Sequence, residues 1–118
     1  MAKILVVDDE PGLRLLYTAE LEDEGYQVVS AADCSEAAAA LENESIDLVV
    51  LDIQIRQESG LEMLQKIVKE RSGLPVILCS AYNCYKDDFA SWLADAYVVK
   101  SSNLQELKSE ITRLLKKK

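Results

Sequence analysis

Short apolar runs alternate along the chain with longer segments in which apolar residues recur every three or four positions. The short runs are predicted to be β-strands and lie at Ile4–Val7, Val28–Val29, Leu48–Leu51, Val76–Cys79 and Ala96–Val99. The longer segments have the spacing of amphipathic helices and occupy the stretches between and after the strands. The chain is therefore predicted to alternate strands and helices from end to end.

Five helices are predicted, the first around Leu13–Leu21. Three of the others begin with an oxygen-bearing cap three residues before an acid: Asp33 with Glu36, Ser59 with Glu62, and Asn103 with Glu106. Gly25 and Gly73 stand where two helices are expected to stop. The fourth helix, within Tyr82–Leu93, has loose apolar spacing and no clear cap. Its place in the alternation is the main reason to expect it.

A repeating strand–helix pattern with nearly continuous apolar strands favours a parallel sheet covered by helices on both faces. The fold class is therefore α/β, a five-stranded parallel sheet doubly wound with five helices in the flavodoxin-like manner. Five strands of this kind commonly order as 2-1-3-4-5, and ligands then bind beyond the carboxyl ends of strands 1 and 3. Residues 1–118 suffice for one domain, so we expect no effector domain and an output through surface contacts.

Composition narrows the function further. Thirteen Lys and Arg against 21 Asp and Glu give a formal charge of −8, which opposes direct nucleic-acid binding. The absence of His excludes a Ser-His-Asp triad, a His-ligated zinc site and a phosphohistidine. Three cysteines without a CxxC pair suit reduced thiols, and no apolar run is long enough for a signal peptide or a membrane span. We therefore expect a cytoplasmic protein with no membrane partner.

Polar residues that can carry chemistry follow four of the predicted strands. Asp8 and Asp9 follow the first strand, Asp52 the third, Ser80 the fourth and Lys100 the fifth. Carboxyl ends of parallel strands share one edge, so these side chains should converge there. Three carboxylates without counter-charge would repel one another, and a hard divalent cation, Mg²⁺, is the expected occupant. A lysine and a hydroxyl could also bind a phosphoryl group, for which Asp52 could be the nucleophile.

Five motifs at these strand ends resemble the receiver domains of two-component response regulators, and the resemblance spans essentially the whole chain. The motifs are Val6-Val7-Asp8-Asp9-Glu10, Leu51-Asp52, Ser59-Gly60-Leu61-Glu62, Pro75-Val76-Ile77 before Ser80-Ala81, and Asp95-Ala96-Tyr97 before Lys100. The resemblance implies that Asp52 accepts a phosphoryl group from a sensor histidine kinase or a phosphotransfer protein in a phosphorelay. No turnover of a diffusible substrate is expected.

The resemblance also implies how the metal is held. Asp9 and Asp52 would ligate Mg²⁺ directly, Asp8 would act through water, and the backbone carbonyl of Gln54 would be a further ligand. Asp8 and Asp9 could instead simply end a strand and cap the following helix. The presence of Asp52 and Lys100 at the same edge favours a functional site.

A switch and a partner surface follow from the same resemblance. Ser80 and Tyr97 would couple phosphorylation to a change of shape, while Lys100 pairs with the phosphoryl group. The aromatic-rich Tyr82–Tyr97 region and the last helix would bind the downstream protein, although those aromatics could equally pack the core.

Two departures from the family pattern leave alternatives open. Arg56 stands where the family usually has proline, within the polar loop Gln54–Glu58, and Ser101 replaces the proline that usually follows the lysine. These departures motivate a pseudo-receiver, an interaction module that is never phosphorylated. A magnesium-dependent phosphohydrolase of the haloacid-dehalogenase type is disfavoured, because such enzymes have a second Asp where this chain has Gln54.

Overall fold

The computed structural model describes residues 2–55, 58–80, 93–100 and 104–116, without the side chains of residues 54, 55, 58, 59 and 80. Five parallel strands form one sheet in the order β2-β1-β3-β6-β7. They are β1 (Lys3–Val7), β2 (Gln27–Ala31), β3 (Leu48–Asp52), β6 (Val76–Ser80) and β7 (Ala96–Val99). In chain order this is the predicted 2-1-3-4-5 arrangement, so the α/β fold class is confirmed.

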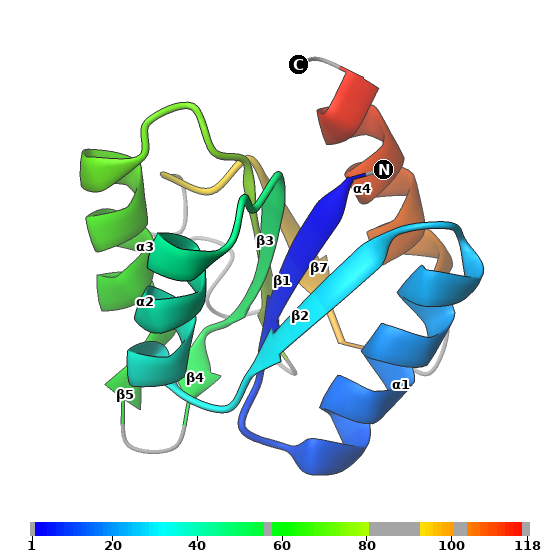
Figure 1. Cartoon of the computed structure of the whole chain (residues 1–118), viewed down its shortest axis with the longest axis horizontal. Coiled ribbons are helices and arrows are strands. Elements are labelled where there is room, and N and C mark those ends of the chain that lie inside the picture. The colour runs from blue at the N-terminus through cyan, green and yellow to red at the C-terminus, as the bar shows by residue number, and fades with distance from the viewer. Residues whose placement is uncertain (1, 56–57, 81–92, 101–103, 117–118) are drawn as a thin grey trace.

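Helices cover both faces of the sheet (Figure 1). Within the described residues they are α1 (Pro11–Asp23), α2 (Cys34–Asn43), α3 (Gly60–Glu70) and α4 (Gln105–Lys116). Figure 1 places α2 and α3 on one face and α1 and α4 on the other. The helix predicted within Tyr82–Leu93 lies outside the described residues. No described helix has the length and apolar character needed to cross a bilayer.

The ends of α1 and α2 show how local sequence sets the helix boundaries. The Asp33 carboxylate accepts a hydrogen bond from the Glu36 N–H at 2.8 Å, and the Glu36 carboxylate accepts one from the Ala32 N–H at 2.6 Å. This confirms the predicted cap of α2, with the return bond one residue earlier than in a standard capping box. Gly25, with a φ of 97°, ends α1 in the left-handed conformation that glycine adopts without strain.

The end of α3 and the loop after β3 both differ from the prediction. Helix α3 ends at Glu70, before Gly73, so the glycine lies in the following turn and does not stop the helix itself. Residues Gln54–Ile55 (β4) and Glu58–Ser59 (β5) form a two-stranded antiparallel ladder where the sequence predicted only a polar loop. Arg56 lies outside the described residues.

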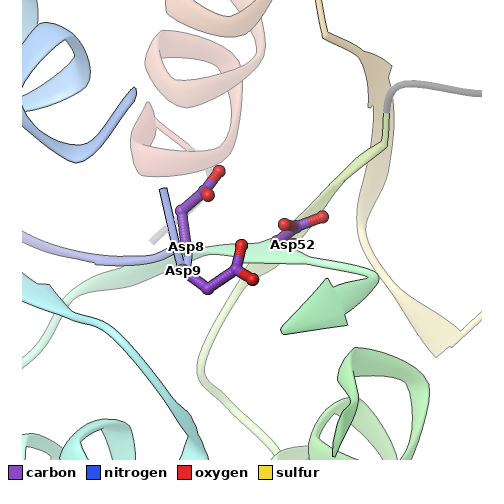
Figure 2. A group of neighbouring side chains, drawn as sticks. All are labelled: Asp8, Asp9 and Asp52. Atoms are coloured by element: carbon purple, nitrogen blue, oxygen red, sulfur yellow. The ribbon is translucent and has the colours of Figure 1, made fainter. Parts of the chain in front are cut away.

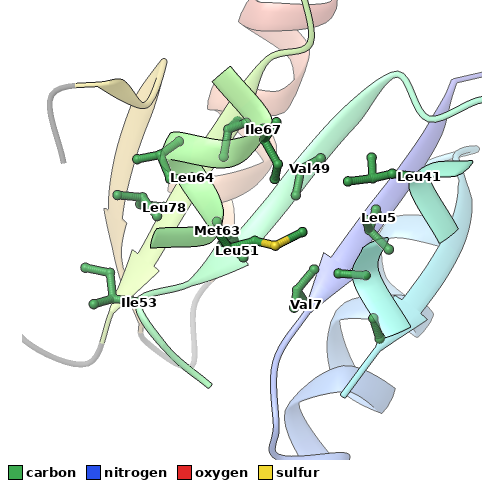
Figure 3. Packing of buried hydrophobic residues seen from close by; sticks show 13 residues of the cluster. Leu5, Val7, Leu41, Val49, Leu51, Ile53, Met63, Leu64, Ile67 and Leu78 are labelled. Carbon is green, nitrogen blue, oxygen red and sulfur yellow. The ribbon is translucent and has the colours of Figure 1, made fainter. Parts of the chain in front are cut away.

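Two apolar cores lie on opposite faces of the sheet. Alternate residues of β1 and β3 point to opposite faces, so Leu5 and Leu51 join one core while Val6 and Val50 join the other. Figure 3 shows the first core, in which Leu64 and Ile67 of α3 pack towards the sheet. Because both faces of the central strands are buried, their sequences are continuously apolar, which explains why they were easy to predict.

Candidate functional site

The central strands deliver three acids to one edge of the sheet. Asp8 continues the β1 ladder by donating its N–H to the Ala31 carbonyl at 3.1 Å, and Asp52 is the last residue of β3. One carboxylate oxygen from each of Asp8, Asp9 and Asp52 lies within 4.8 Å of the other two. Figure 2 shows the three side chains gathered where β1 and β3 end. The predicted convergence of the acids is therefore observed.

Asp8 is almost completely buried and is held at three oxygen atoms. Its Oδ1 accepts from the Glu10 N–H at 2.9 Å, and its Oδ2 accepts from Lys100 Nζ at 2.8 Å. Its backbone carbonyl accepts from Arg14 Nη1 at 2.6 Å. The bond to Glu10 closes an Asx-type turn immediately before α1, which begins with Pro11 at its first position. Asp8 therefore both orders the turn and contributes to the acidic cluster.

Lys100 follows the edge strand β7 and reaches back to the centre of the site. Its Nζ lies 2.8 Å from Asp8 Oδ2 and 3.0 Å from Asp52 Oδ2, and the three side chains are only 2–13% exposed. Burial acts to lower the pKa of Lys100, but the hydrogen bond to Asp8 and the negative charge of Asp52 outweigh it and raise that pKa. The lysine therefore stays charged and neutralises part of the charge of the three acids.

The donor set fits a small hard cation. One carboxylate oxygen from each acid lies within 4.8 Å of the other two, and carboxylate oxygens are the ligands that a hard cation such as Mg²⁺ prefers. All three side chains of the cluster are carboxylates, and one lysine leaves them with an excess of negative charge. Asp9, which is only partly buried, is more accessible than Asp8.

Tyr17 and Cys79 lie beneath the acids as neutral buried groups. Burial raises the pKa of Cys79 to about 12, with Lys100 opposing this effect and Asp52 and Asp8 adding to it. Burial is also the main cause that raises the pKa of Tyr17, followed by the neighbouring Cys79. The nearness of Tyr17 to the acids could not be predicted from the sequence, because it depends on how α1 packs against the sheet.

The remaining predicted site residues are only partly described. Gln54 begins β4, two residues after Asp52, and Ser80 ends β6 opposite Val99; the side chains of both lie outside the description. Tyr97 pairs with Leu78 in the sheet and is half-buried against the core that contains α3. The Tyr82–Leu93 part of the proposed partner surface and the Lys100–Ser101 peptide bond also lie outside the described residues.

Comparisons with known proteins agree with this architecture. A family model described as "Response regulator receiver domain" matches residues 4–112. The probable transcriptional regulatory protein TcrX of Mycobacterium tuberculosis is 38% identical over 116 residues, covering 97% of this chain and 50% of TcrX. The transcriptional regulatory protein GlrR of Escherichia coli is 37% identical over 90 residues, covering 76% of this chain and 20% of GlrR. The chain thus spans half or less of these two curated relatives.

Solved structures match the chain over nearly its full length. The response regulator TrrA from Thermotoga maritima, crystallised in complex with Mg²⁺–BeF, is 45% identical with a TM-score of 0.93, covering 97% of this chain and 99% of TrrA. A crystal structure of the histidine kinase ThkA in complex with TrrA matches with a TM-score of 0.91 at the same identity, covering 98% of this chain and 99% of the matched one. A CheY-like receiver protein from Methanospirillum hungatei is 34% identical with a TM-score of 0.92, covering 99% of this chain and 95% of that one.

The fold and the acidic edge define a doubly wound signalling domain, and the sequence match assigns its family. The chain belongs to the response regulator receiver domains of two-component systems. Members of this family act by phosphorylation-dependent signalling and are not enzymes that turn over a diffusible substrate. The alternative of a haloacid-dehalogenase-type phosphohydrolase is therefore set aside.

Proposed function

We propose that this receiver takes a phosphoryl group onto Asp52 from a sensor histidine kinase or a phosphotransfer protein, in a reaction that requires Mg²⁺. The observation that carries the proposal is the position of Lys100 Nζ, 2.8 Å from Asp8 and 3.0 Å from Asp52. The carboxylates of Asp8, Asp9 and Asp52 lie within 4.8 Å of one another on the same edge. The complexes of the similar TrrA with Mg²⁺–BeF and with the kinase ThkA support the same cofactor and the same kind of partner for this chain.

Asp52 is the nucleophile of the proposed reaction. A carboxylate oxygen forms the new bond to phosphorus while the bond between phosphorus and the donor's leaving atom breaks, and the leaving group retains the electron pair. Asp52 and Asp9 would hold Mg²⁺ directly, together with the Gln54 carbonyl. Both carboxylate oxygens of Asp8 already accept protein hydrogen bonds, which favours contact through water. When bound, the ion would neutralise charge on the transferred oxygens.

Three residues near the site would respond to phosphorylation of Asp52: Lys100, Ser80 and Tyr97. Lys100 Nζ, now shared between two carboxylates, would transfer one of its hydrogen bonds to a phosphoryl oxygen. Ser80 stands at the same sheet edge through its backbone pairing with Val99, which suits a hydroxyl that donates to the phosphoryl group. Tyr97 is half-buried and would move further inward as Ser80 approaches the phosphate.

The output would pass through protein contacts in the cytoplasm. We propose that the Tyr82–Tyr97 region and α4 bind the downstream protein, and the exposed Leu93 on that surface supports this. The formal charge of −8 argues against direct nucleic-acid binding by this chain. The chain has three cysteines and no CxxC pair, which is consistent with a reducing compartment.

Intact-mass analysis after incubation with acetyl phosphate tests the proposal. We expect the protein to gain one phosphoryl mass with Mg²⁺ and to gain none when the metal is chelated. The variant Asp52→Ala should gain none under either condition, whereas Asp23→Ala, at the exposed end of α1, should behave as the wild type. A folded wild type that gains no mass with Mg²⁺ would instead indicate the pseudo-receiver.

A further inference from the structure

Gly60, the first residue of α3, lies directly against the end of β3. Its N–H donates to the Ile53 carbonyl at 2.5 Å. A Cβ atom at Gly60 would overlap the backbone carbonyl oxygen of Asp52 and would lie 2.7 Å from the Ile53 carbonyl oxygen and 2.8 Å from the Ile53 Cα. All three neighbours are backbone atoms, so none can turn aside as a flexible side chain could.

The requirement for glycine at this position comes from space and not from an unusual backbone angle. Among the four glycines only Gly25 has a positive φ. At Gly12 and Gly73 an added Cβ would meet no atom within 4 Å. Gly60 is therefore the one glycine whose missing side chain makes room for the backbone of the proposed phosphoacceptor.

The peptide that follows Asp52 is held from two sides. Its N–H, on Ile53, donates to the Cys79 carbonyl of β6 at 3.1 Å, while the next carbonyl, also on Ile53, accepts from Gly60. Gln54, the residue after Ile53, pairs with Ser59 in the β4–β5 ladder and is thus also held beside the start of α3. The end of β3 is thus fixed between the sheet and the start of α3.

We infer that Gly60 is a positioning residue for phosphoryl acceptance: its close backbone contact sets where the Asp52 carboxylate and the Gln54 carbonyl stand relative to Lys100. The inference rests on the proposed function of Asp52. A side chain at this position must displace the Asp52 carbonyl, and a displacement of about 1 Å at a reacting group can reduce a rate by roughly 100-fold. Mg²⁺ affinity falls as well, because Asp52 is also a ligand.

The test compares Gly60→Ala with Gly73→Ala, the same substitution in a turn where the new methyl group meets nothing. Both proteins are first shown to be folded by circular dichroism at 25 °C. The Mg²⁺ dissociation constant is measured by calorimetry with the metal alone, and the rate of phosphorylation by acetyl phosphate is measured by intact mass at saturating Mg²⁺. We expect Gly60→Ala to bind Mg²⁺ several-fold more weakly and to react about 10- to 100-fold more slowly, with Gly73→Ala matching the wild type.

Amide NMR signals separate positioning from a general loss of stability. In Gly60→Ala the signals of Asp52, Ile53 and Gln54 should shift while those of β1 stay in place. A folded Gly60→Ala that binds Mg²⁺ and reacts within twofold of Gly73→Ala would overturn the inference. If the wild type binds Mg²⁺ but takes up no phosphoryl group, the proposed function fails, and the Mg²⁺ affinities alone decide the role of Gly60.

The wild type provides a second test that does not depend on the variant's folding. During a Mg²⁺ titration the Gly60 amide should shift with the same apparent affinity as Asp52 and Ile53, because its N–H donates to the Ile53 carbonyl and the Asp52 carbonyl lies where its Cβ would be. An unchanged Gly60 signal beside shifting Asp52 and Ile53 signals would contradict the positioning role.

Discussion

At the scale of single residues, Lys100 is the counter-charge that allows the acids to be buried together. Its ammonium group contacts Asp8 and Asp52, whose side chains are 2% and 9% exposed. Removing one partner from such a buried cluster leaves charges without compensation, which costs more than an exposed ion pair contributes. The lysine is thus important to the resting protein as well as to the proposed reaction.

The variant Lys100→Met should lower the free energy of unfolding by about 3 kcal/mol without Mg²⁺, because Asp8 and Asp52 lose their shared cation. Excess Mg²⁺ should restore part of this loss, so the metal should stabilise the variant more than the wild type. Urea unfolding with and without Mg²⁺ measures both effects. The exposed Lys66→Met is the control, and equal metal stabilisation of all three proteins would contradict the prediction.

The same lysine predicts how stability depends on pH. The pKa of Lys100 is raised above its ordinary value of 10.5 in the folded protein, so its stabilising contribution is complete below that pH. The contribution should shrink as the pH rises above 10.5 towards the higher folded pKa. The difference in unfolding free energy between wild type and Lys100→Met, measured in urea at increasing pH from neutral, should therefore narrow only above about pH 10.5. A difference that narrows between pH 6 and 9 would refute this assignment.

Residues differ in how well the sequence alone predicts their roles. Asp8, Asp52 and Lys100 could be placed because each follows a strand, and parallel strands end at a common edge. The contact of Gly60 with the Asp52 backbone depends on how the chain returns through β4 and β5, which no local pattern encodes. The hydrogen bond from Arg14 to the Asp8 carbonyl was missed for the same reason, since it depends on how α1 packs.

At the scale of elements, the cap of α2 is a local feature that should act independently of the site. The variant Asp33→Ala removes the acceptor of the Glu36 N–H and should lower the free energy of unfolding by about 1 kcal/mol. Ser35→Ala, at an exposed position in the same turn, should change it by less than about 0.5 kcal/mol. Urea unfolding measures both, and phosphorylation of Asp33→Ala at 25 °C should match the wild type. Equal effects of the two substitutions would argue against the cap.

Elements were predictable where burial imposes a pattern. The strands β1 and β3 are buried on both faces and give unbroken apolar runs, whereas β4 and β5 have two residues each and leave no periodicity to detect. Gly73 predicts a later end for α3 than the structure shows, since the helix ends at Glu70 and the glycine lies in the following turn. A glycine marks a nearby turn more reliably than it marks the last helical residue.

At the scale of the whole molecule, the acidic edge is where the two cores meet. Tyr17 and Cys79 belong to the core on the α1 and α4 face, and Ile53 belongs to the core on the α2 and α3 face. Asp52 stands between them at the end of β3. A change of charge at Asp52 therefore occurs beside both cores and can affect the helices on both faces of the sheet. This suits a domain whose phosphorylation state must be recognised by another protein at its surface.

The bond between Lys100 and Asp8 joins residues that are 92 positions apart in the chain. During synthesis the first acids leave the ribosome long before their cation exists, and they remain uncompensated until nearly the whole domain has emerged. A partly made chain therefore cannot present the finished acceptor site to a kinase. The ion pairing of the site is therefore completed only after Lys100 has been made and the edge strand β7 has joined the sheet.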